Sequence, residues 1–189
     1  MPIPRLCPSS TVLLVIDVQE RLMPTIAAAP RVEANCAILA RAAGVLGVPV
    51  ICTEQYVRGL GHTVATVRDA LPHGTAIVEK TRFSALTDGV RSRLQASARP
   101  NVVVCGVEAH VCVLQSSLDL LASGWRVFHA TDAISSGQRD QVEPAFRRIE
   151  AAGGVPTGTL GAMYELAGDA AHPAFRDLLA LAKLVPKNG

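Results

Sequence analysis

The 189-residue sequence has few aromatic side chains, little net charge and no long apolar run. Aromatic residues make up 4% of the chain, and the formal net charge is +2. The Lys and Arg residues are scattered, so the chain lacks both the stacking aromatics and the basic stripe that favour nucleic-acid binding. The first apolar run, residues 11–16, is interrupted by Asp17 and is too short for a signal peptide or a membrane span. We therefore expect a cytoplasmic protein with neither a nucleic-acid nor a membrane partner.

The sequence also lacks the spacings of familiar metal, nucleotide and redox motifs. Its 5 cysteines show no disulfide framework, and its 5 histidines form no H-x-x-x-H or H-E-x-x-H pattern. There is no G-x-G-x-x-G fingerprint and no Walker loop. Cys105 and Cys112 are too far apart for C-x-x-C chemistry. We expect no metal and no cofactor, and we expect most cysteines to be buried as small hydrophobic residues.

Short β-branched apolar runs alternate with helical patterns along the chain. Such runs are typical of strands buried on both faces of a parallel sheet, because crossover helices cover each face. Helix-like stretches at 31–46, 110–123 and 139–152 each end just before a glycine, the usual stop. The sequence predicts a single α/β domain over residues 1–189, in three α/β/α layers. The expected strands are residues 12–17, 48–53, 76–80, 101–106 and 126–131, with a weaker one near 155–159.

Polar side chains follow these runs at the points where the strands end. The carboxyl ends of parallel strands meet at one edge of the sheet, where open α/β folds bind their ligands. Asp17, Lys80 and Cys112 would bring a carboxylate, an ammonium and a thiol to that edge. Each has an ordinary alternative when it is considered alone. Asp17 could cap the next helix, Lys80 could be a solvated lysine, and Cys112 could be a buried structural thiol.

Cys112 lies where a helix is expected to begin, shortly after the strand that ends at Gly106. The partial positive charge of a helix N-terminus lowers the pKa of a nearby thiol. This position therefore predicts a more reactive thiol than that of a free cysteine. Cys105 lies inside the expected strand, and we interpret it as structural.

Four segments together resemble the isochorismatase-like cysteine hydrolases, a family that includes nicotinamidases and carbamoyl-sarcosine amidohydrolases. They occur in the family's order and at its spacing, and they cover most of the chain. These segments are LLVIDVQERL (13–22), EKTRFSAL (79–86), CGVEAHVCVLQSSLDL (105–120) and ATDAISS (130–136). Two further stretches, TEQYVRGLG (53–61) and LAGDAAHPAF (166–175), look most like isochorismatase-domain proteins of poorly defined substrate.

The resemblance implies a six-stranded parallel sheet in the order 3-2-1-4-5-6 and a catalytic triad of Asp17, Lys80 and Cys112. In this family the thiol attacks a carbonyl carbon to form a thioester, and the aspartate passes the thiol proton to the leaving amine. Lys80 would hold Asp17 ionised and favour the thiolate. The backbone N–H groups of Glu108 and Cys112 would form an oxyanion hole. A cis peptide bond would link Val107 to Glu108.

Two departures from the family pattern bear on the substrate. Nicotinamidases carry Asp-x-His after the second strand, where this chain has Gln55-Tyr56-Val57, so neither a metal site nor nicotinamide is expected. True isochorismatases lack the cysteine and cleave a vinyl ether, whereas Cys112 is present here. The resemblance thus implies hydrolysis of a small amide or related C–N substrate. The alternatives are an isochorismatase-type vinyl-ether hydrolase and a non-catalytic thiol sensor.

The expected partner is a small-molecule substrate. The candidate substrate-binding residues are Gln19, Gln55, Tyr56, Phe83 and Glu108. For Glu108 and His110 the sequence leaves two roles open, since they could contact the substrate or pair with each other or with Lys80. The resemblance also implies self-association as a dimer or tetramer, and the apolar stripe in residues 172–184 fits either that or docking on the body of the protein.

Overall fold

The computed structural model describes residues 3–187 and contains a six-stranded sheet whose strand pairs are all parallel. The strands lie in the order β3-β2-β1-β4-β5-β6, which confirms the predicted order. Their bounds are β1 Thr11–Ile16, β2 Val50–Gln55, β3 Ala76–Lys80, β4 Asn101–Val107, β5 Arg126–Ser135 and β6 Val155–Thr157. The chain runs from β1 outward to β2 and β3, then returns to β4 on the other side of β1. This reversal creates the crevice in which open α/β sheets bind ligands.

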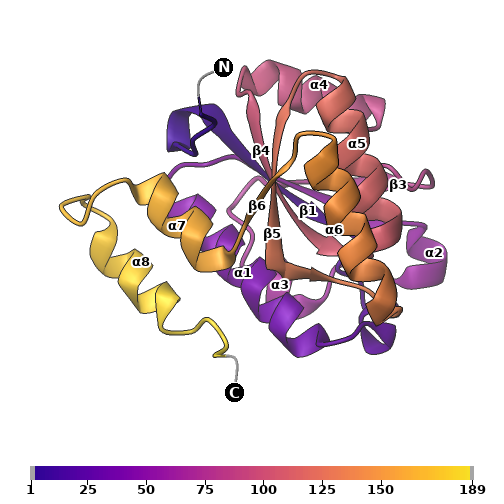
Figure 1. Ribbon diagram of the computed structural model, residues 1–189. Helices are drawn as coiled ribbons and strands as arrows, with labels where there is room; N and C mark the ends of the chain where they lie inside the picture. Colours follow the sequence, from indigo (N-terminus) through magenta and orange to yellow (C-terminus); the bar gives the residue numbers. More distant parts are fainter. Residues whose placement is uncertain (1–2, 188–189) are drawn as a thin grey trace.

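Helices cover both faces of the sheet, as predicted (Figure 1). One face carries α1 (Ala29–Val45), α7 (Thr159–Ala167) and α8 (Phe175–Ala182), and the other carries α4 (Asp88–Ser97), α5 (Leu114–Ala122) and α6 (Val142–Ala151). Strand β1 shows why the chain needs both layers. Leu13 and Val15 pack into the core under α1, whereas Val12 and Leu14 pack into the core under α5, because successive strand residues point to opposite faces.

Two segments differ from the sequence-based expectation in ways that affect the site. Strand β2 ends at Gln55, two residues later than predicted, so Glu54 and Gln55 belong to the strand itself. The helix expected at 110–123 begins as a π-helical turn, η3 (Ala109–Val113), and only then continues as α5. Between β2 and β3 the irregular segment contains the short helices α2 (Val57–Leu60) and α3 (Ala65–Arg68).

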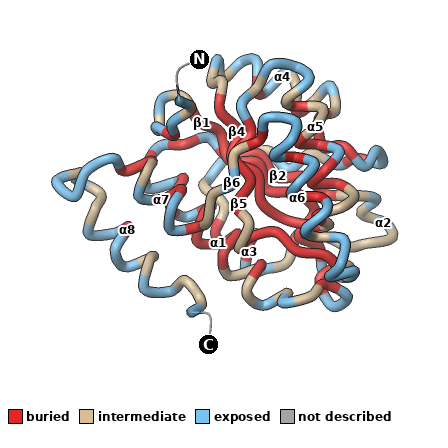
Figure 2. The backbone as a smooth tube through the Cα atoms, viewed as in Figure 1, coloured by how far each residue is buried: buried red, intermediate tan, exposed pale blue. Residues whose placement is uncertain are grey.

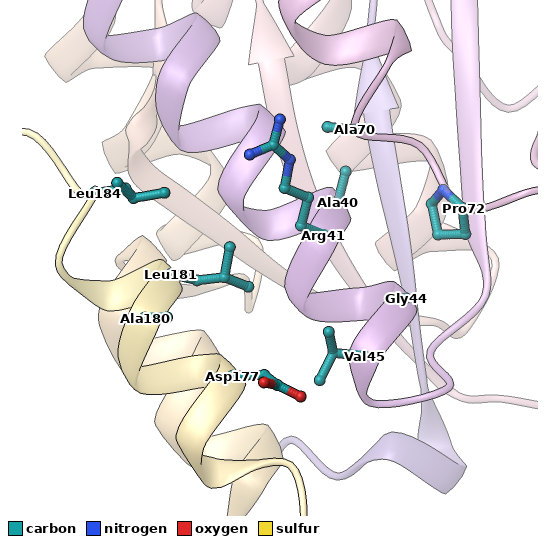
Figure 3. A pocket seen from close by; sticks show the side chains of 10 residues that line it. All are labelled: Ala40, Arg41, Gly44, Val45, Ala70, Pro72, Asp177, Ala180, Leu181 and Leu184. Atoms are coloured by element: carbon teal, nitrogen blue, oxygen red, sulfur yellow. The ribbon is translucent and has the colours of Figure 1, made fainter.

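The last helix, α8, lies at the side of the molecule and is mostly exposed (Figures 1 and 2). The residues of the apolar stripe predicted over 172–184 differ in how far they are buried. Leu178 is fully buried in the core, whereas Leu179 and Leu184 remain 40% and 58% exposed. Between α1 and α8 lies a groove of about 650 Å³, walled by small and aliphatic side chains with Arg41 and Asp177 at its sides (Figure 3).

None of the helices in the described part of the chain is both long enough and apolar enough to span a membrane.

Candidate active site

The side chains of Asp17, Lys80 and Cys112 meet at the carboxyl edge of the sheet. Asp17 directly follows β1, Lys80 ends β3, and Cys112 lies on η3 after β4. Lys80 Nζ lies 2.5 Å from Asp17 Oδ2 and 3.8 Å from Cys112 Sγ. The long lysine side chain crosses beyond the end of β2 to reach the crevice between β1 and β4. The prediction that these three groups meet where the strands end is therefore confirmed.

Asp17 is held by the backbone and by a neighbouring strand. Its φ of 53° lies in the left-handed region, which few non-glycine residues adopt. Its side chain is fully buried, and Oδ1 accepts a hydrogen bond of 2.7 Å from Thr53 Oγ1. No helix begins at Asp17, since the next helical turn, η2, starts at Met23. The helix-cap alternative is therefore wrong, and the carboxylate instead faces Lys80.

The ammonium of Lys80 has a complete set of acceptors despite its burial. Its side chain is 0% exposed, so the solvated alternative is wrong. Besides Asp17, Nζ donates to Gln55 Oε1 at 2.7 Å and approaches the carbonyl oxygens of Arg82 and Phe83, each at 3.2 Å. A buried charge is tolerated when it is paired and hydrogen-bonded. The arrangement fixes the cation beside the thiol.

The thiol of Cys112 behaves differently from the expectation based on helix position. Burial, together with the nearby charge of Asp17, raises its pKa to about 12, while Lys80 acts in the opposite direction. The prediction that the helix N-terminus lowers the Cys112 pKa is therefore wrong, because desolvation of the thiolate outweighs that effect. The thiol is protonated at neutral pH. A nucleophilic attack from this site needs a base, and Asp17 is adjacent.

The segment that leads to Cys112 passes very close to β1. Gly106 has a φ of +114°, and a Cβ atom there would lie 2.0 Å from the carbonyl oxygen of Ile16. Only glycine fits this approach. The peptide bond between Val107 and Glu108 is cis. The chain then enters η3, which carries Cys112 toward the crevice.

The candidate substrate-binding residues fall into two groups. Gln19 is fully buried, and its amide is occupied by the backbone: Nε2 donates to the carbonyls of Gln55 and Gly61, while Oε1 accepts from the Gln55 N–H. These bonds suit Gln19 to holding the 55–61 loop rather than to contacting a substrate. Tyr56 and Phe83 are 56% and 54% exposed, and Tyr56 lines a hollow of about 470 Å³ near Lys80.

Glu108 and His110 meet through a serine that the sequence analysis did not single out. Glu108 Oε2 accepts hydrogen bonds from Ser136 Oγ at 2.9 Å and from the Gly137 N–H at 2.8 Å. Ser136 Oγ also lies 2.9 Å from His110 Nδ1. Of the roles that the sequence left open, the structure shows an indirect pairing of the two residues. Ser136 closes the ATDAISS motif, which was the available signal.

The loop beside the crevice is held by polar contacts of Glu54. Glu54 Oε1 accepts from both the N–H and the hydroxyl of Thr63, each at 2.7 Å, and its other oxygen lies 3.0 Å from His62 Nδ1. Within residues 3–187 no cluster of three or more His, Cys, Asp or Glu side chains is arranged to hold a metal ion.

Comparisons with known proteins relate nearly the whole chain to one family. The family model named Isochorismatase domain matches residues 11–160. The chain is 37% identical over 180 residues to isochorismatase domain-containing protein 2 of Danio rerio, covering 94% of this chain and 89% of that protein. A solved structure described as MAR1 ribonuclease from Caenorhabditis elegans matches with a TM-score of 0.94 and 36% identity, covering 98% of this chain and 96% of that chain. The YcaC gene product of Escherichia coli, described as an octameric hydrolase of unknown specificity, has the same fold, with a TM-score of 0.83, 22% identity, and coverage of 98% and 100%.

Proposed function

The chain belongs to the isochorismatase family, and on that premise we propose that it hydrolyses a small amide or related C–N substrate through a thioester on Cys112. Family membership and its structural relatives support a hydrolase in general terms. One observation carries the finer proposal. A buried ammonium, that of Lys80, contacts both a carboxylate and a thiol, at 2.5 Å from Asp17 Oδ2 and 3.8 Å from Cys112 Sγ.

The first chemical step joins the thiol to the substrate carbonyl. Because the Cys112 pKa is raised to about 12, the thiol is neutral when the substrate arrives. Asp17 takes the thiol proton as sulfur attacks the carbonyl carbon, and Lys80 stabilises the negative charge that develops on sulfur. The carbonyl π electrons move to oxygen, which accepts hydrogen bonds from the backbone N–H groups of Glu108 and Cys112. One such donor is worth about 10²–10³ in rate.

The second half of the reaction returns the enzyme to its starting state. Asp17 gives its proton to the leaving nitrogen as the C–N bond breaks, so an amine departs and a thioester remains on Cys112. Asp17 then takes a proton from water, which attacks the thioester. The same oxyanion donors serve again, and the C–S bond breaks with the proton returned to sulfur. Tyr56 and Phe83, which are 56% and 54% exposed, remain the candidate substrate contacts, together with Gln55.

The metal-independent form of this chemistry rests on residue types. The family's zinc-binding nicotinamidases carry Asp-x-His at the position where this chain has Gln55-Tyr56-Val57. Gln55 instead uses its amide oxygen to accept from Lys80 and its amide nitrogen to donate to the Thr81 carbonyl at 2.8 Å. It therefore supports the triad directly.

A panel of small amides tests the proposal. Wild-type protein should release ammonia or an amine from at least one member, whereas Cys112→Ala and Asp17→Asn should lower turnover by at least about 10³-fold. Cys7→Ala is the matched control, because Cys7 is exposed and remote in sequence from the triad. Mass spectrometry after rapid acid quenching should detect an acyl adduct on Cys112. Turnover that survives Cys112→Ala would refute the thioester route.

The alternatives belong in the same experiment as separate arms. Release of pyruvate from isochorismate by both wild type and Cys112→Ala would instead support a vinyl-ether hydrolase. Oxidation of Cys112 by peroxide, with no turnover of any substrate, would support a thiol sensor. An RNA arm is included because one relative is described as a ribonuclease. Cleavage there without acylation of Cys112 would also contradict the proposal.

Self-association as a dimer or tetramer remains a prediction for this chain. The Escherichia coli neighbour is described as octameric, but at that identity its likeness concerns the fold. Sedimentation velocity across a range of concentrations measures the assembly directly. A single species with the monomer mass throughout would contradict the prediction.

A further inference from the structure

We propose that Glu108 is a positioning residue, which holds the reactive turn through a partly buried polar clamp and does not bind the substrate. The clamp consists of Glu108, His110, Ser136 and Gly137. The inference rests on the proposed function, since it concerns how the oxyanion hole and the nucleophile of that reaction are placed. It replaces the expectation that the Glu108 side chain is a substrate ligand.

Ser136 is the centre of the clamp. The residue is fully buried, and its Oγ lies 2.9 Å from both Glu108 Oε2 and His110 Nδ1. A hydroxyl has one hydrogen to donate. With the carboxylate accepting that hydrogen, the His110 ring must donate its Nδ1–H to the serine oxygen. The Gly137 N–H supplies a second donor to the same Glu108 oxygen, at 2.8 Å.

The clamp connects the nucleophile's segment to the stretch that precedes α1. Glu108 and His110 flank the start of η3, two to four positions before Cys112 in the sequence. On its other side, the clamp segment is bonded to the stretch that follows Asp17. The Ser136 carbonyl accepts from the Ala27 N–H at 3.1 Å, and Ser135 Oγ donates to the Ala27 carbonyl at 2.7 Å. Ala27 lies ten positions after Asp17 and just before α1, so the ends of β4 and β5 share one anchor with the stretch that precedes α1.

Gly137 allows these three segments to approach. A Cβ atom at this position would lie 2.9 Å from the Thr25 carbonyl oxygen and 3.4 Å from Glu108 Oε2. The first distance is shorter than real Cβ contacts, so a side chain here would displace the backbone at Thr25, whereas the second is an ordinary contact. The glycine is therefore needed for space on the Thr25 side of the clamp.

Loss of the clamp should affect two reactions of Cys112 to different extents. Anchoring the Glu108 side chain holds its backbone N–H, which the proposed mechanism aims at the developing oxyanion. Loss of the anchor should therefore slow attack on a carbonyl. It should affect alkylation of Cys112 by iodoacetamide far less, because that displacement at a saturated carbon forms no oxyanion. The ratio of the two rates separates positioning from general damage.

The test compares Ser136→Ala and Glu108→Gln with Ser117→Ala. Ser117 is the matched control, since it is equally buried and its hydroxyl has no hydrogen-bond partner. Ser136→Ala should lower kcat on the amide by about 10²-fold, with KM and the iodoacetamide rate at Cys112 within about 2-fold of wild type. Glu108→Gln keeps an acceptor for the Gly137 N–H and should lose less than Glu108→Ala. The control should match wild type in every assay.

Amide hydrogen exchange gives a readout that does not require turnover. In Ser136→Ala the amides of residues 107–113 and of Gly137 should exchange faster than in wild type and in Ser117→Ala. Unchanged exchange would overturn the clamp, whatever the enzyme's substrate. So would a Glu108→Ala variant with raised KM and unchanged kcat, which is the behaviour of a substrate ligand. If wild type shows no acylation of Cys112, the proposed function fails, and hydrogen exchange alone decides the clamp.

Discussion

The crevice at the strand ends and the groove between α1 and α8 are opposites in chemical character. The groove, at about 650 Å³, is larger than the hollow of about 470 Å³ that Tyr56 and Lys80 line, and its walls are mainly aliphatic (Figure 3). The crevice contains a carboxylate and an ammonium whose side chains are 0% exposed, beside a thiol residue that is 6% exposed. In this molecule the larger cavity is therefore not the place where ionisable side chains are buried together. Desolvated, mutually paired ionisable groups are a better guide to chemistry than cavity size.

The two regions also differ in what their burial costs. Removing an ion pair from water carries a desolvation penalty that a surface pair does not meet, so a buried pair is weak support for stability. The aliphatic walls of the groove have no such penalty. The crevice therefore holds groups that folding alone gives little reason to keep, and three predictions follow from that contrast.

The largest effect is expected from Lys80→Met, which removes the cation and leaves the Asp17 carboxylate buried. Breaking a buried pair in this way should lower the free energy of unfolding by about 3–5 kcal/mol, and amide turnover should be lost. Lys183→Met changes the same side chain at an exposed position and is the control. Urea denaturation measures the difference. Equal stability of the two variants would mean that the crevice is no more demanding than the surface.

An intermediate effect is expected in the pH dependence of thiol alkylation. Burial raises the Cys112 pKa to about 12, whereas hydrogen bonds from Ser10 and Ser9 hold the pKa of the exposed Cys7 below its ordinary value. At pH 7 iodoacetamide should therefore label Cys112 at least about 10-fold more slowly than Cys7. The Cys112 rate should go on rising above pH 9, after the Cys7 rate has levelled off.

Peptide mass spectrometry of each site resolves the two rates. A Cys112 rate that levels off below pH 9 would show that the thiolate is already formed in the free protein. Lys80 and the helix N-terminus would then outweigh burial, which would reverse the assignment of Asp17 as the base that the thiol requires.

The smallest effects are expected in the groove. Leu184→Ser changes a side chain that is 58% exposed and should alter the free energy of unfolding by no more than about 0.5 kcal/mol. Leu178→Ala is the contrasting variant outside the groove, because it removes a fully buried side chain of α8 and should cost about 2–5 kcal/mol. Both variants should retain turnover once folded. Loss of turnover in Leu184→Ser, at unchanged stability, would show that the groove contributes to the chemistry.

Much of this architecture could be predicted from short-range patterns. Buried strands such as β1 and β4 are short apolar runs rich in β-branched residues, and the order of the strands followed from the family resemblance. The end of β2 was misplaced by two residues because Glu54 and Gln55 interrupt the apolar run. Both side chains are nonetheless satisfied, by Thr63 and His62 in one case and by Lys80 in the other, so polar residues could extend a strand that looked complete.

Other features depended on partners distant in the sequence. Ser136 shows no local sign that it bonds Glu108, 28 positions away. Gln19 looked like a substrate ligand until its amide was seen to hold the loop at 55–61. The direction of the Cys112 pKa also depends on how completely the surrounding layers exclude water, and no local pattern reports that.

The sequence by itself determined which groups reach the sheet edge, because strand periodicity and strand ends are local properties of the chain. Those local properties predict Asp17, Lys80 and Cys112 at the carboxyl edge of the sheet. Only the tertiary structure decided their state: a lysine fully desolvated against a carboxylate, a thiol kept protonated, and a glutamate turned to Ser136. Burial and long-range hydrogen bonding set these properties, since both arise only when segments far apart in the chain pack together.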